Sequence, residues 1–106
     1  MNNTISIIGN VGQDPKVKEF ESGKKVANFS VAVKDYSAKD DKPMWLEVEA
    51  WNELAERVLK ILSKGREVAV TGRLSLDSYK QTDGTAVTKP VIIMSGFHAC
   101  GKQASQ

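Results

Sequence analysis

Two tryptophans stand six residues apart in segment 44–51, where apolar and other side chains alternate. Successive side chains of a strand point to opposite faces, so Trp45 and Trp51 share a face with Glu47 and Glu49. This face is the worse candidate for burial, because unpaired buried carboxylates are costly. We therefore expect both indoles on an exposed face, where they could stack on planar ligands.

Tyr79 extends this pattern in segment 67–79, where Val68, Val70, Leu74 and Leu76 form the apolar face to be buried and Tyr79 shares the opposite face with Arg73. It is therefore also expected to face outward. Exposed aromatic rings among cations suit a single nucleic-acid strand, because every base offers a face for stacking, worth about 1 to 3 kcal/mol, while cations neutralise phosphates. The candidate cations are Lys34, Lys39, Lys42, Lys64, Arg66, Arg73, Lys80 and Lys89.

Glu47 and Glu49 count against this interpretation, since they would repel phosphates unless they pair across strands with residues such as Lys34 or Arg73. A single outward tryptophan is often covered by a loop or a subunit, and a scattered lysine is usually only a solvated surface residue. Two tryptophans and a tyrosine on matching faces nevertheless favour binding over a purely structural role.

Other chemistry finds little support in the sequence. The glycines of segment 9–12 are not followed by Gly-Lys-Ser/Thr, as a phosphate-binding loop requires. His98 and Cys100 are two potential metal ligands, whereas a structural zinc site needs about four. No serine has an evident His and Asp beside it. We expect a binding protein and not an enzyme, with no metal and no cofactor.

Strands and one helix must position these residues. Alternating or β-branched segments predict strands over 4–9, 26–34, 44–51, 67–79 and 87–97, and a short alternating segment covers 16–20. Apolar residues at helical spacing predict a helix over 52–64, with Asn52 as its N-cap and Gly65 at the left-handed position that ends it. Pro90 cannot donate to a ladder and predicts a sheet edge or a bulge.

Five short antiparallel strands around one core, with one helix after the third, predict an all-β, five-stranded Greek-key barrel, the OB-fold. A split β-sandwich or a ferredoxin-like fold is the weaker alternative, and the latter needs a second helix. A chain of 106 residues has room for one domain, which we place over residues 1–101, followed by a short tail over 102–106.

Composition excludes several classes of protein. Hydrophobic residues make up 41% and charged residues 26% of the chain, which is typical of globular domains. The net charge of +2 is too weak to identify a polyanionic partner by itself. No apolar run approaches the length of about 18 residues that a membrane span needs. A single cysteine and an N-terminus unlike a signal peptide predict a cytoplasmic protein.

The sequence also resembles bacterial-type single-stranded DNA-binding proteins from about Asn3 to Gly101. The resemblance rests on the segments 9–15 (GNVGQDP), 26–33 (VANFSVAV) and 51–56 (WNELAE), on Trp45, and on Lys64-Gly65 and Gly72-Arg73-Leu74.

This resemblance implies an OB-fold homotetramer that wraps single-stranded DNA without sequence preference during replication, repair and recombination, in the cytoplasm with the nucleoid or in an organellar or plastid equivalent. It implies stacking roles for Trp45, Trp51 and Tyr79, with Tyr36 near a further loop aromatic and Lys64 at a basic position near the end of the helix. Glu53 stands where some members have a basic residue.

Family members usually continue into a flexible tail with an acidic tip that recruits other proteins. The last residues here, 101–106, contain no acid, which puts tail-mediated recruitment in doubt. Two alternatives stay open. One is a primosome-type OB-fold accessory that acts mainly through protein contacts, and the other is an interaction module whose exposed aromatics form a subunit interface. The residues do not distinguish DNA from RNA.

Overall fold

The computed structural model describes residues 3–34 and 42–101. Tyr36 and Lys39, two of the residues predicted to bind nucleic acid, therefore lie outside the described residues, as does the segment 102–106. The described elements, in chain order, are β1 (Ile5–Val11), β2 (Lys16–Glu19), β3 (Lys25–Val33), β4 (Met44–Trp51), α1 (Glu53–Ile61), β5 (Glu67–Lys80) and β6 (Ala86–Cys100).

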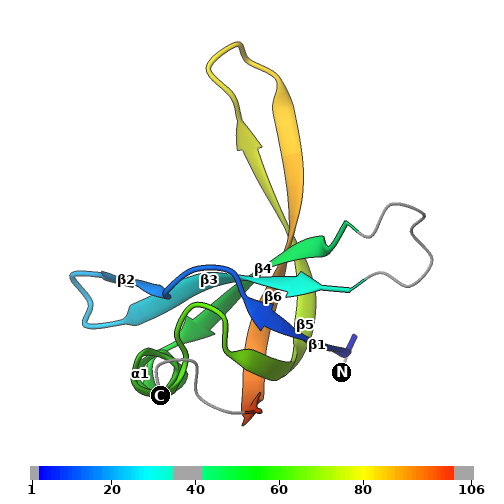
Figure 1. Ribbon diagram of the computed structural model, residues 1–106. Coiled ribbons are helices and arrows are strands. Elements are labelled where there is room, and N and C mark those ends of the chain that lie inside the picture. Colours follow the sequence, from blue (N-terminus) through cyan, green and yellow to red (C-terminus); the bar gives the residue numbers. More distant parts are fainter. Residues whose placement is uncertain (1–2, 35–41, 102–106) are drawn as a thin grey trace.

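Five of the strands close into a ring. The neighbouring strands of the sheet are, in order, β1-β5-β6-β4-β3. β1 also pairs with β3, so the two ends of this row of strands meet and the sheet is closed. The pairings within the ring are antiparallel except for a short parallel contact between β4 and β6. β2 pairs only with β3 and forms a flanking hairpin outside the ring (Figure 1). The five predicted strands are thus the ring strands, and segment 16–20 supplies a sixth, short one.

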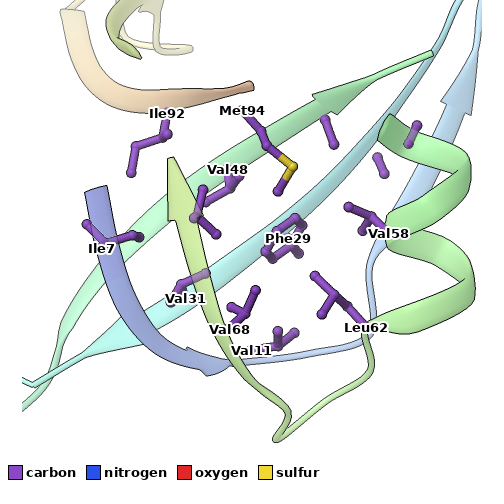
Figure 2. Close-up of a cluster of buried hydrophobic side chains, with 14 residues drawn as sticks. Ile7, Val11, Phe29, Val31, Val48, Val58, Leu62, Val68, Ile92 and Met94 are labelled. Atoms are coloured by element: carbon purple, nitrogen blue, oxygen red, sulfur yellow. The ribbon is translucent and has the colours of Figure 1, made fainter. Parts of the chain in front are cut away.

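The core fills the inside of this ring. Alternate residues of each ring strand point inward, and Phe29 lies in the middle of the cluster that they form (Figure 2). Val58 of α1 and Leu62, just after that helix, approach Phe29 from one end of the ring. The helix therefore closes one opening of the barrel, and the other face of each strand remains available for contacts.

The ends of α1 differ from the prediction over 52–64. The helix ends at Ile61, because Leu62 takes an extended conformation with φ −97° and ψ 140°. Asn52 makes no side-chain cap. Its Oδ1 accepts a hydrogen bond of 3.3 Å from the backbone N–H of Lys25, so this side chain ties the end of β4 to β3 instead. Gly65 does have the predicted left-handed conformation, with φ 91°.

β5 and β6 extend beyond the ring as a two-stranded ribbon. β1 pairs with β5 only as far as Gly72, and β4 pairs with β6 only over 91–93, so residues 73–80 and 86–90 project from the barrel (Figure 1). Leu74 and Leu76, predicted on the buried face, are therefore 39% and 65% exposed, because no core lies beneath them. Pro90 lies in this ribbon, where β6 pairs with β5 but no longer with β4, so it occupies a sheet edge as predicted.

In the part of the chain that the structure describes, no helix has both the length and the apolar character needed to cross a membrane.

Candidate nucleic-acid interface

β4 places both indoles on the outer face of the barrel. Val48 and Ala50 point into the core, so the residues between and beside them point outward. The side chain of Trp45 is 57% exposed and that of Trp51 is half-buried. The predicted placement of the two tryptophans is confirmed: both lie on the same outer face as Glu47 and Glu49, which we call the tryptophan face.

Trp45 lies against the backbone of Gly12, which follows β1. A Cβ atom built at this glycine would overlap the Cζ3 atom of the indole and would come within 2.9 Å of Ser30 Oγ. The backbone N–H of Gly12 donates a 2.9 Å hydrogen bond to the carbonyl of Ser30, which fixes this segment beside β3. The indole of Trp45 can therefore occupy this position only because residue 12 is a glycine and has no side chain.

Trp51 is held by two neighbours. Its ring stacks on Phe20, with 5.8 Å between the ring centroids and 11° between the planes. Its Nε1 donates a 3.2 Å hydrogen bond to Glu49 Oε1. The Lys18 ammonium lies 5.3 Å from the centroid of Phe20 and so completes a row of a cation and two rings. This row presents partly exposed aromatic surface next to a positive charge.

Sequence reasoning missed Phe20 and the two lysines of β2. Lys16 pairs with Asn28 and Lys18 with Val26, and these β3 residues pair in turn with Glu49 and Trp51 of β4. Directly paired residues point to the same side of a sheet, so β2 adds both lysines to the tryptophan face. The alternation in segment 16–20 was the available signal, because a hairpin between β2 and β3 follows from it.

The partners of the two glutamates of this face differ from the expectation. Glu47 Oε1 lies 3.4 Å from Lys89 Nζ, across the contact of β4 with β6. Glu49 accepts the hydrogen bond from Trp51. The partner of Glu47 is thus Lys89, not Lys34 or Arg73, because the parallel contact of β4 with β6 brings the base of the ribbon to the middle of β4.

Comparison with known proteins decides the family. Residues 2–99 match the model of the family described as "Single-strand binding protein family". The chain belongs to this family. It is 37% identical over 103 residues to single-stranded DNA-binding protein 1 of Synechocystis, covering 95% of this chain and 85% of that protein.

Two further relatives agree. Single-stranded DNA-binding protein 2 of Nostoc is 32% identical, over 93% of this chain and 78% of its own length. The single-stranded DNA-binding protein of Paenarthrobacter aurescens is 38% identical over 76% of this chain, and the match covers 52% of that protein. The closed ring with a helix between β4 and β5 is accordingly the OB-fold of a single-strand binding protein, as the sequence predicted.

In this family member the predicted cations fall into separate groups. Arg73 pairs with Ile93, which pairs with Glu49, so Arg73 and the Glu47-bound Lys89 belong to the tryptophan face. Tyr79 and the neighbouring Lys80 lie further out on the ribbon, where the Tyr79 side chain is 50% exposed.

The remaining described cations lie elsewhere. Lys64 and Arg66 are at the opposite end of β5 from the ribbon, and Arg66 Nε donates a 3.1 Å hydrogen bond to the carbonyl of Cys100. Lys34 lines a surface pocket with Ile8 and Glu67. Lys42 is exposed just before β4. The structure therefore does not bring all the predicted cations together.

One carboxyl group near the ribbon has a shifted pKa. The backbone N–H of Thr85 donates a 2.9 Å hydrogen bond to Asp83 Oδ1, and this bond lowers the pKa of Asp83 below its ordinary value. Asp83 lies in the turn that joins β5 to β6, beyond Tyr79 and Lys80. Among the described residues, no cluster of three or more His, Cys, Asp or Glu side chains could hold a metal ion.

Replacing Gly12 by alanine tests the support of Trp45. We expect the added methyl group to displace the indole, because it would occupy the space of the ring, and to weaken oligo(dT) binding by about 1 kcal/mol, the lower end of one lost stacking contact. Tryptophan emission and a binding titration measure the two effects. Gly96→Ala is the matched control, since no atom lies within 4 Å of its added Cβ. Unchanged emission and affinity in Gly12→Ala would contradict this account of Trp45.

Proposed function

We propose that this protein binds and protects single-stranded DNA without sequence preference during replication, repair and recombination. The observation that carries the proposal is the pair of indoles on the outer face of β4, which the barrel does not need for its own core. Exposed aromatic surface costs free energy in water, and a stacked base would cover it. Every base has such a face, so stacking gives affinity with little discrimination between sequences.

In this proposal the bases stack on Trp45, Trp51 and Tyr79, and the family resemblance adds Tyr36. Phe20 supports Trp51 from the side of β2. The ribbon carries Tyr79 away from the barrel (Figure 1). A DNA strand that reaches all of these rings must therefore run from the outer face of β4 along β5. The bound path is therefore longer than the barrel face alone.

Cations on both sides of the rings neutralise the phosphates. Arg73 and Lys89 lie on the ribbon side, and Lys16 and Lys18 on the side of β2. Lys34, Lys39, Lys42, Lys64, Arg66 and Lys80 are proposed to contact DNA that continues around the protein. Lys64 and Arg66 lie at the end of β5 opposite the ribbon, so DNA that reaches both Tyr79 and these two cations must run along the barrel.

We further propose a homotetramer built from OB-fold domains over residues 1–101, in the cytoplasm with its DNA. Support comes from aliphatic surface that lies apart from the indoles. The side chains of Ile8 and Leu76 are 62% and 65% exposed, and Leu74 and Leu76 line a groove with Ile5. Exposed aliphatic patches favour subunit contacts. Several binding faces on one strand raise the effective concentration of each and so add avidity.

Oligo(dT) titration tests the DNA-binding proposal. Tryptophan fluorescence should fall strongly as bases stack on the indoles. Trp45→Ala and Trp51→Ala should each weaken binding by about 1 to 3 kcal/mol. Affinity should fall with salt, with a log-log slope near −0.7 for each phosphate neutralised. The absence of quenching at low salt would remove the DNA hypothesis. Repeating the titration with oligo(U) separates DNA from RNA binding.

Light scattering tests the assembly. The wild-type protein should have the mass of four chains, and Leu76→Ser should lower that mass, because the substitution places a hydroxyl group in an apolar contact. Leu59→Ser is the matched control, since Leu59 is a 40% exposed leucine on α1. A wild-type dimer that fails to quench with oligo(dT) would favour the primosome-type accessory, which acts through protein contacts.

A further inference from the structure

An ion pair occupies the middle of the tryptophan face. Glu47 stands two residues after Trp45 in β4, and its Oε1 lies 3.4 Å from Nζ of Lys89. Both side chains are close to half exposed, at 42% for Glu47 and 48% for Lys89. The ion pair is therefore accessible from the side on which DNA bases stacked on the indoles would lie.

The two acids of this face are not equivalent. Glu49 accepts a hydrogen bond from the indole N–H of Trp51, so it supports an aromatic ring, and no lysine of residues 3–34 and 42–101 forms an ion pair with it. Glu47 instead takes up a cation that the proposed function assigns to phosphate. Asp77 also faces Lys89, because the two residues are directly paired between β5 and β6. The Lys89 ammonium nevertheless lies at Glu47, across the contact of β6 with β4.

An exposed ion pair of this kind contributes little and exchanges partners readily, because water screens both charges. A phosphate that approaches Lys89 must take the place of the Glu47 carboxylate. The ammonium then loses one anion as it gains another, and the released carboxylate stays close to the strand. Lys89 consequently adds less to affinity than a lysine that begins without an anionic partner.

We infer that Glu47 is an affinity-limiting residue of the DNA site: it competes with the phosphate backbone for Lys89. This inference rests on the proposed single-stranded DNA binding. When the DNA leaves, the Glu47 carboxylate again takes the place of the phosphate beside Lys89, so the pair stabilises the free protein and lowers the affinity. In this site the Glu47 carboxylate and a DNA phosphate therefore alternate as the anion beside Lys89.

Glu47→Gln provides the main test, because it keeps the shape of the side chain and removes its charge. Binding should be measured by fluorescence with an oligo(dT) short enough to occupy a single subunit. Affinity should rise about two- to fivefold, the range that an exposed ion pair allows. The log-log salt slope should steepen by about 0.7, because one further phosphate is neutralised by a cation with no internal partner.

Asp77→Asn is the matched control. It makes the same change in net charge, and its side chain faces the same lysine, but the ammonium is paired with Glu47. We expect less than half of the Glu47→Gln effect on affinity. An equal effect of the two substitutions would mean that net charge, and not the ion pair, limits affinity, and would overturn the inference.

Lys89→Gln separates competition for the lysine from direct repulsion of phosphate. In this background Glu47→Gln should no longer raise affinity, since no ammonium remains to be released. A full effect of Glu47→Gln without Lys89 would overturn the inference. If the wild-type protein binds oligo(dT) and Glu47→Gln does not tighten binding, the inference alone fails. If the wild-type protein does not bind, the proposed function fails, and the inference fails with it.

Discussion

The alternation of side chains in a closed ring of strands is the constraint on which the rest of this structure depends. Because the ring has one interior, the residues of β4 that fill it fix the direction of all the others. Val48 and Ala50 are 1% and 0% exposed, which forces the tryptophans outward. A slip of one residue would bury two indoles and two glutamates and expose the core residues, so the strand has one tenable register.

The tryptophan face is then shaped by residues distant in the sequence. Gly12 leaves room for one indole, whereas Phe20 and Glu49 hold the other by a ring contact and a hydrogen bond. Lys89 reaches the face from β6 and meets Glu47 there. The site thus combines prearranged rings with charges that are already partly balanced.

The sequence predicted the parts that depend on local alternation. The ring strands, the outward indoles and the left-handed Gly65 all follow from patterns within a few residues. It failed where partners come from other strands. The alternation of β5 continues past Gly72, but the ring does not, so Leu74 and Leu76 were wrongly expected to be buried.

The same limit applies to the contacts of single side chains. The pairing of Glu47 with Lys89 depends on the parallel contact of β4 with β6, which periodicity does not specify. The N-cap predicted for Asn52 is absent, because its side chain bonds to the backbone of Lys25 across the β3–β4 pair. The role of Phe20 was not predicted, because it depends on a stacking contact with Trp51, which is 31 positions further along the chain.

Photocrosslinking tests most directly whether bases stack on this face. An oligonucleotide carrying 5-iododeoxyuridine would be bound, irradiated and digested, and the attachment sites mapped by mass spectrometry. The account predicts adducts at Trp45 and Trp51, with further adducts on the ribbon at Tyr79. Adducts confined to the surface of β1 or to the end of the barrel near Arg66, with none at either tryptophan, would contradict it.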